Sequence, residues 1–100
     1  MNNVQLRLNN NEGAFYIMEN TEQIAKMEVG IKENILTVYH TEVAEKAEGK
    51  GLAKALLAAM VEHARTNKLK VVALCPYVHF QFQKHPEQYS DIWQKNEAAA

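Results

Sequence analysis

Hydrophobic and polar residues alternate along the first half of the chain with the two-residue period of β-strands. Residues 4–8 and 23–29 follow this alternation, while residues 14–18 and 35–40 are richer in the aromatic and β-branched side chains that favour extended structure. Turn-forming sequences separate the segments. The pattern therefore predicts four short strands in an antiparallel meander.

One of these segments is ambiguous. Residues 23–29 follow Thr21 and Glu22, and that sequence is also compatible with the start of a helix. The short length of the segment and the Gly30 that follows it favour a strand. We expect a strand here, with a helix as the alternative.

The second half of the chain changes to the helical period. Leu52–Thr66 carries apolar residues three and four positions apart, which predicts an amphipathic helix. The apolar face of this helix is expected to include Leu52, Leu56, Ala59, Met60 and His63. Residues 69–75 have the pattern of a buried strand, and Pro76 ends it. Residues 77–84 fit either a strand or a helix, and residues 88–93 fit a short helical turn.

These elements predict a mixed α/β fold in the order β-β-β-β-α-β, followed by a short helical carboxyl-terminal segment. A chain of 100 residues is large enough for one core and too small for two. We expect a single domain over residues 1–95 and a frayed tail at 96–100.

The strand at 35–40, the long helix and the strand at 69–75 form a β-α-β unit, so the two strands should be parallel. Parallel strands end at the same edge of a sheet, where the helix between them begins. Three segments should therefore converge there, at residues 40–43, 48–53 and 75–77. This edge would bring together an imidazole, a thiol, a phenol and a helix start.

The connection before the helix reads Glu48-Gly49-Lys50-Gly51-Leu52 and lacks the Ser, Thr, Asp or Asn that usually caps a helix start. The first turn of a helix leaves about four backbone N–H groups without intrahelical partners. Glycines let the backbone approach a ligand, so these groups suit an anion such as phosphate. A simple tight turn is the alternative, because the patterns of dinucleotide-binding and P-loop motifs are incomplete.

Composition narrows the classes of function. The formal net charge is −1 and the lysines are dispersed, so we expect no nucleic-acid partner. No apolar run approaches the ~20 residues of a membrane span, and the amino terminus has no signal-peptide pattern. The single cysteine, Cys75, excludes an intramolecular disulfide and suits a reducing compartment, so we expect a cytoplasmic protein. The scattered histidines predict no metal site.

The ordered set of motifs resembles the GNAT N-acetyltransferases. It comprises H-T-E-V at 40–43, E-G-K-G-L-A at 48–53, a Leu/Ala-rich helix, V-A-L-C-P-Y-V at 72–78 and K-H-P-E-Q-Y at 84–89. The combination is specific, although the glycine loop alone is not. More narrowly, the chain looks like a small single-domain branch of this superfamily with a Cys-Pro-Tyr block.

The resemblance implies a mixed sheet splayed at its centre, with acetyl-CoA or coenzyme A entering the splay. The pyrophosphate would lie on the loop that begins at Lys46, where the family has Gln or Arg, and the pantetheine arm would pair with a strand edge. The implied cofactor-binding residues are Glu42, Val43, Ala44, Glu48, Gly49, Lys50, Gly51, Leu52, Ala53, Phe80 and Lys84. Larger members carry amino-terminal helices that shape the acceptor site, whereas this sequence begins with strands. We therefore expect the acceptor groove to be open, or completed by a partner.

Acetyl transfer to an amine needs a neutral nucleophile, an oxyanion donor and a proton for the departing thiolate. A backbone N–H near Val43 is a candidate oxyanion donor. Cys75 is a candidate covalent acceptor or proton donor, with a small buried hydrophobic residue as the alternative. His40 is a candidate base, and Tyr77 a candidate proton donor to sulfur. Each of these two also has a purely structural alternative.

The predicted function is acetyl-CoA-dependent N-acetylation of an unidentified amine, on a small molecule or a protein, by a monomer or weak homodimer. The alternative is a module that binds CoA or acyl-CoA in a regulatory role without turnover. A third hypothesis, an interaction domain, predicts no cofactor binding at all.

Overall fold

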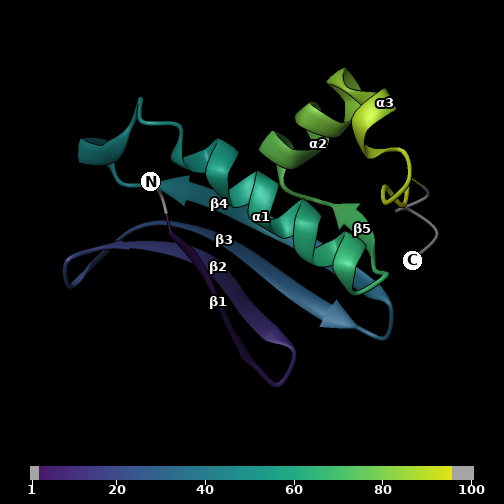
Figure 1. Cartoon of the computed structure of the whole chain (residues 1–100), viewed down its shortest axis with the longest axis horizontal. Helices are drawn as coiled ribbons and strands as arrows, with labels where there is room; N and C mark the ends of the chain where they lie inside the picture. Colours follow the sequence, from purple (N-terminus) through teal and green to yellow (C-terminus); the bar gives the residue numbers. More distant parts are fainter. Residues whose placement is uncertain (1–2, 96–100) are drawn as a thin grey trace.

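The computed structural model describes residues 3–95 and contains one five-stranded mixed sheet. The strands lie side by side in chain order, and only the last pair, β4 and β5, is parallel. Their bounds are Val4–Asn9 (β1), Glu12–Glu19 (β2), Glu22–Lys32 (β3), Ile35–Val43 (β4) and Lys70–Ala73 (β5). The predicted meander and the predicted parallel β-α-β unit are both confirmed (Figure 1). The expected tail at 96–100 lies outside the described residues.

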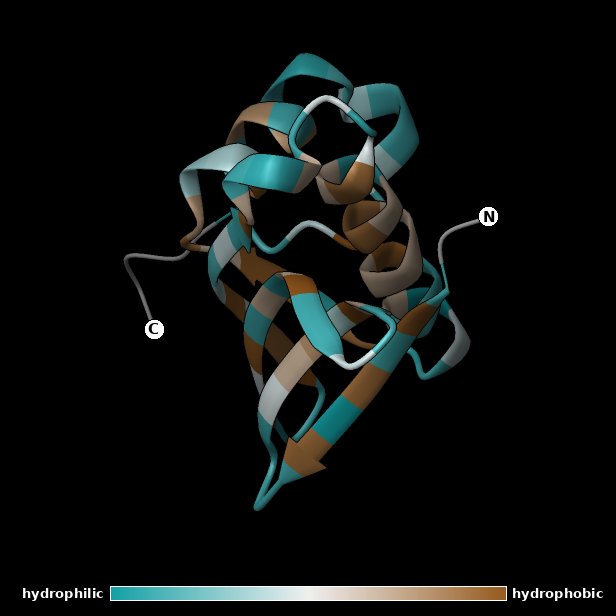
Figure 2. Cartoon of the chain, turned by 90° about the vertical axis from the view of Figure 1, so that its left-hand side faces the viewer, coloured by the Kyte–Doolittle hydropathy of each residue, from teal (hydrophilic) through white to brown (hydrophobic). Residues whose placement is uncertain are grey.

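The helices gather on one face of the sheet, as Figures 1 and 2 show from two directions. A short 3-10 helix η1 (Glu45–Ala47) precedes α1 (Leu52–Thr66), and α2 (Pro76–Lys84) and α3 (Pro86–Tyr89) follow β5. The inner, helix-facing side chains of the sheet join those of α1 and α2 in one hydrophobic core. Completely buried members of this core include Met27, Leu36, Val38, Leu56, Met60, Val71, Val78 and Phe82. The outer face of β1–β4 is mostly polar.

Several elements differ in length from the sequence-based expectation. Strand β3 runs through Gly30 to Lys32, because the turn to β4 is tight and uses Glu33 in the left-handed region at φ 57°. The ambiguous segment 77–84 is helical. Pro76 occupies its first turn, which suits the fixed φ of proline, and Val78 and Phe82 are buried one turn apart.

Strands β4 and β5 differ most from their predicted lengths. We expected β4 to end at His40, but it continues to Val43, while β5 ends at Ala73 instead of reaching Cys75. The last pair between these strands is Val38 with Ala73. The long strand therefore extends past the end of its short parallel neighbour, and the two part at this point.

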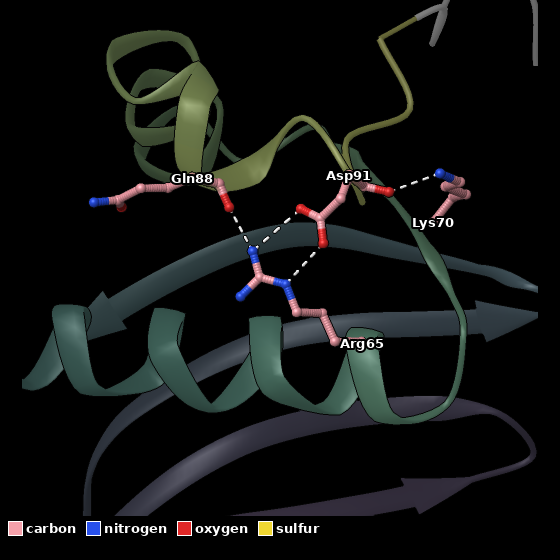
Figure 3. A network of polar contacts seen from close by, with 4 residues as sticks. All are labelled: Arg65, Lys70, Gln88 and Asp91. Carbon is pink, nitrogen blue, oxygen red and sulfur yellow. Dashed lines mark hydrogen bonds and ion pairs between the residues drawn. The ribbon is translucent and has the colours of Figure 1, made fainter.

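Two sets of contacts hold the carboxyl-terminal segment beside β5. Residue Trp93 forms a bridge with Val71 at the outer edge of β5. Figure 3 shows the second attachment, in which the Arg65 guanidinium at the end of α1 binds Asp91 with Nε–Oδ2 2.9 Å and Nη2–Oδ1 3.1 Å. The same guanidinium donates to the Gln88 carbonyl oxygen, and Lys70 Nζ donates to the Asp91 carbonyl oxygen at 2.7 Å. These contacts connect α1, β5 and the segment after α3.

Candidate functional site

A gap between β4 and β5 forms the centre of the candidate site. A β-bulge lies where the gap begins: Val38 faces Val29 of β3, His40 faces Glu28, and Tyr39 is the extra residue between them. A bulge bends its strand and increases the local twist. The bend therefore coincides with the point at which β4 loses contact with β5, and the two features together open the sheet.

The edge of β4 along this gap carries unused backbone groups. The Ala44 N–H donates to the Ile24 carbonyl oxygen at 2.8 Å, so Ala44 faces β3. Backbone direction alternates along an antiparallel strand, which turns Glu42 toward β3 and turns the N–H groups of Thr41 and Val43 toward the gap. Of the three predicted strand contacts 42–44, Val43 is the one whose amide faces the gap. The sheet also has a small hollow of about 170 Å³ beside residues 42–44.

The glycine loop adjoins the open end of β4. Gly49 and Gly51 both have left-handed backbones, with φ of 83° and 75°, and Gly51 is the N-cap residue of α1. No side chain caps this helix, and its first internal bond is from Ala55 N–H to the Gly51 carbonyl oxygen at 3.0 Å. The amides of residues 52–54 precede that bond and lack intrahelical partners. A Cβ added at either glycine would meet nothing within 4 Å, so space is open beside the loop.

The charges around this helix start favour an anion. The first turn of α1 contains no acidic residue, and Lys50 and Lys54 are exposed beside it. The positive end of a helix dipole attracts negative charge within about one turn. Leu52 is buried, and among the predicted cofactor residues it therefore offers its backbone only. Glu48 is exposed, and Ala53 is half-buried.

Lys46, at the first position of the predicted loop pattern, is paired with a carboxylate of the protein itself. Its Nζ forms an ion pair with the Glu22 carboxylate at the start of β3. That hydrogen bond raises the pKa of the Lys46 ammonium. The pair joins the loop to the β-sheet, which gives this lysine a structural role.

Cys75 lies at the closed end of the gap. Its backbone N–H donates to the Val38 carbonyl oxygen at 2.9 Å, and the residue is the N-cap of α2. The side chain is 2% exposed, and Sγ lies 3.3 Å from the Thr41 hydroxyl oxygen on β4. The thiol therefore bridges the two sides of the gap. Thr41 was not among the residues singled out from the sequence.

Tyr77 is half-buried in the first turn of α2. Burial raises the pKa of the Tyr77 phenol, and the nearby Tyr89 and Cys75 add to this shift. The phenol is consequently protonated throughout the neutral range and can donate a proton. Phe80 and Lys84 lie farther along the helix, with Lys84 Nζ 5.7 Å from the Phe80 ring centre, and Phe80 is 55% exposed. Both side chains are exposed, and their contact with a coenzyme stays a prediction.

The structure separates His40 from Cys75. His40 lies on the outer face of the sheet, with Nε2 3.5 Å from Glu42 Oε1, whereas Thr41 and Cys75 lie on the inner face. The cause is the bulge at Tyr39. Simple alternation from the buried Val38 would place His40 on the inner face, and the extra residue exchanges His40 for Thr41. A single sequence gives no sign of this bulge, which explains why Thr41 was missed.

The outer-face carboxylates are paired. Lys26 Nζ lies 2.8 Å from Glu28 Oε2 and 3.4 Å from Glu42 Oε2. The hydrogen bond from Lys26 lowers the pKa of the Glu28 carboxyl. The Glu42 side chain is thus engaged on the outer face, and it does not point into the gap.

The described residues 3–95 lack the features of two other classes of site, a membrane-spanning helix and a metal centre. No helix in this range has the length and apolar character needed to cross a membrane. Within the same range, His, Cys, Asp and Glu side chains form no group of three or more that could hold a metal ion.

A mixed sheet that parts beside an uncapped, glycine-rich helix start is the arrangement that the resemblance to the GNAT N-acetyltransferases implies. Comparison with known proteins gives the family. A family model described as GCN5-related N-acetyl-transferase matches residues 14–92, and the chain belongs to this family. Acetyl transfer is therefore its general class of reaction.

Solved structures agree with this assignment. A GCN5-like protein from Staphylococcus aureus has 33% identity and a TM-score of 0.64, covering 89% of this chain and 86% of its own. A ribosomal-protein-alanine N-acetyltransferase from Brucella melitensis (23% identity, TM-score 0.60) shares the fold over 80% of this chain and 62% of its own. The Escherichia coli ribosomal-protein-S18-alanine N-acetyltransferase (15% identity, TM-score 0.58) shares it over 64% and 42%. No curated protein matches the sequence.

Proposed function

We propose that this protein transfers the acetyl group of acetyl-CoA to a primary amine. The observation that carries the proposal is the free edge of β4 beyond Val38, which lies between the uncapped start of α1 and Cys75. Free amides along one strand suit the extended amide-bearing arm of the coenzyme. The neighbouring helix start suits its pyrophosphate.

The residues that hold the donor follow from this arrangement. Amides of residues 52–54 bind the pyrophosphate, and Gly49 and Gly51 keep the approach clear of side chains. The Val43 N–H faces the gap and is the candidate oxyanion donor. Phe80 and Lys84 flank the far end of the coenzyme. Acetyl-CoA supplies an activated thioester, and the protein supplies position, hydrogen bonds and proton transfer.

Cys75 is the proposed first acceptor of the acetyl group. In that step the bond from Sγ to the acetyl carbon forms, the bond from that carbon to the coenzyme sulfur breaks, and the thiol proton ends on the coenzyme thiolate. Attack by a neutral amine then forms the bond from nitrogen to the acetyl carbon, breaks the bond from that carbon to Sγ, and transfers one amine proton to Sγ. Both steps balance without another reactant.

Tyr77 is the proposed proton donor to the departing thiolate. Its raised pKa keeps the phenol protonated at neutral pH, and its position two residues after Cys75, in the first turn of α2, supports a role beside the sulfur. The phenol regains a proton from the thiol, so the pair acts as a relay. His40 is proposed as the base only for an amine that approaches over the outer face, because its side chain lies there.

We propose that the chain belongs to the small single-domain branch with the Cys-Pro-Tyr block, seen here at residues 75–77. The acceptor is a small-molecule or protein amine, and the protein acts in the cytoplasm as a monomer or weak homodimer. Its single buried cysteine supports a reducing compartment.

Calorimetric titration with acetyl-CoA and CoA tests the proposed donor site, using wild type, Gly51→Asn and Asn10→Ala. Asparagine tolerates a left-handed backbone, so Gly51→Asn adds a side chain at the loop with little strain. We expect affinity to fall about ten-fold or more, since one displaced phosphate contact is worth about 1.5 kcal/mol or more. Asn10→Ala strains a left-handed residue in the distant β1–β2 turn, and binding should not change.

The outcomes separate the candidate functions. Absence of binding to the wild type overturns the proposed donor site. Binding without loss of acetyl from the coenzyme, in the presence of a panel of amines, supports the CoA-binding module instead. Binding followed by acetyl transfer supports the proposed enzyme.

A further inference from the structure

Thr41 is the residue of β4 that touches the Cys75 side chain. Its Oγ1 lies 3.3 Å from Sγ, and the contact joins residues 34 positions apart in the chain. Thr41 lies opposite Met27 on the inner face of the sheet, beyond the last pair of β4 with β5. The hydroxyl therefore spans the closed end of the gap.

The surroundings of the sulfur make this hydroxyl important. Cys75 is 2% exposed and belongs to the hydrophobic core, where a negative charge on sulfur is unfavourable without a hydrogen-bond donor. The Cys75 side chain does not cap α2, so no hydrogen bond to the amides of that helix holds it. Its own amide is already bonded to Val38. Thr41 places a hydroxyl at hydrogen-bond distance from the sulfur.

We infer that Thr41 is a positioning residue, which holds the Cys75 thiol in the gap and donates a hydrogen bond from its hydroxyl to the sulfur when the thiolate forms. The inference deepens the proposed function, because it assumes that Cys75 acts through its sulfur. The hydroxyl is the part of Thr41 that matters. Serine at this position keeps it, whereas valine has almost the same shape and lacks it.

Thiol reactivity tests this inference without acetyl-CoA. Cys75 is the only cysteine in the chain, so alkylation of a thiol by iodoacetamide reports on this site alone. Intact-mass measurement follows the fraction of protein that carries one added carbamidomethyl group. Rates are compared at neutral pH for wild type, Thr41→Ser, Thr41→Val and Thr37→Val. The last is the same substitution at another half-buried threonine of β4, away from Cys75.

We expect Thr41→Val to slow alkylation about ten-fold, since hydrogen bonds to charged groups are the stronger ones. Thr41→Ser should stay within about two-fold of wild type, and Thr37→Val should match it, because both keep the hydroxyl at Cys75. Circular dichroism checks that each variant is folded. Equal rates in wild type and Thr41→Val, including no reaction of either, overturn the inference.

Incubation of the same proteins with acetyl-CoA distinguishes a failure of thiol positioning by Thr41 from a failure of the covalent route through Cys75. An acetyl adduct that forms on wild type and Thr41→Ser, and more slowly on Thr41→Val, supports both. Slower alkylation of Thr41→Val with no acetyl adduct on wild type supports the positioning of the thiol and overturns the covalent route.

Discussion

The Val38 carbonyl oxygen accepts the Cys75 amide at 2.9 Å, and it accepts the Leu74 amide as well, at 3.0 Å. These two hydrogen bonds to one acceptor end the pairing of β4 with β5, and the chain then turns into α2. It also fixes the backbone of the cysteine against the strand that carries Thr41 and Val43. The position of the thiol is therefore set by the same contact that closes the gap.

Replacement of Cys75 by alanine should abolish covalent acetylation. Intact mass after quenched incubation with acetyl-CoA should show one acetyl group on wild type and none on Cys75→Ala, because the sulfur is the proposed acceptor. The Val38 contact uses the backbone, so the variant should still fold and bind CoA. An unmodified wild type under the same conditions contradicts the covalent route.

Replacement of Tyr77 by phenylalanine should slow acetyl transfer about 10²-fold, the usual contribution of a positioned acid. The raised pKa lies above the ordinary phenol value of about 10. Wild-type activity should therefore persist to high pH and fall as pH rises through that pKa, and the variant should lack this limb. Tyr89→Phe, which keeps the ring stacked 4.8 Å from Phe82, is the matched control. Equal rates in both variants contradict the assigned role.

Replacement of Gly13 by alanine should destabilise the sheet. A Cβ at this position would lie 1.8 Å from the Arg7 carbonyl oxygen, so β1 and β2 would have to separate. We expect urea unfolding to show a loss of about 3 kcal/mol, at the upper end of overpacking effects. Gly30→Ala is the control, because its Cβ would meet the movable Tyr39 hydroxyl at 3.0 Å. A similar loss in both variants contradicts the steric explanation.

The Arg65–Asp91 pair should make stability depend on acidic pH. The hydrogen bond from Arg65 lowers the pKa of the Asp91 carboxyl. Its stabilisation is therefore complete above the ordinary carboxyl pKa of about 4 and is lost as pH falls through the lower folded value. Asp91→Asn should reduce the unfolding free energy by about 1 kcal/mol or less at pH 7, because both side chains are substantially exposed.

Urea titrations of wild type and Asp91→Asn at several pH values check this dependence. The difference between the two proteins should shrink toward zero as pH falls through the acidic range. Glu62→Gln, which changes an exposed carboxyl on α1 outside the network of Figure 3, is the control. A difference that stays constant with pH indicates that the carboxyl charge does not contribute.

The sequence predicted the elements whose signals are local and repeated. The bounds of α1 agree with the structure because its apolar period continues over several turns, and several of its residues, such as Leu56 and Met60, are fully buried. Segment 77–84 was ambiguous because Val78 and Phe82 fit both a strand face and successive turns of a helix. The exposure of Phe80, at 55%, belongs to the helix.

The sequence predicted which segments form the candidate site. It did not predict which face of the sheet each side chain of β4 occupies. The glycine loop follows the far end of β4, and Cys75 lies where β4 and β5 part, in the chain order that the β-α-β topology requires. The extra residue at Tyr39 arises from pairing with β3, which no alternation within β4 reveals. It moved His40 to the outer face and brought Thr41 to the sulfur.

The bare outer face of the sheet has a consequence for the choice of acceptor. Within residues 3–95, every helix lies on the opposite face of the sheet, so no described helix covers the outer face (Figure 2). An enclosed site acts as a steric filter that admits small molecules only. The open outer face sets no such size limit, so it excludes neither an amine on a folded polypeptide nor a small metabolite.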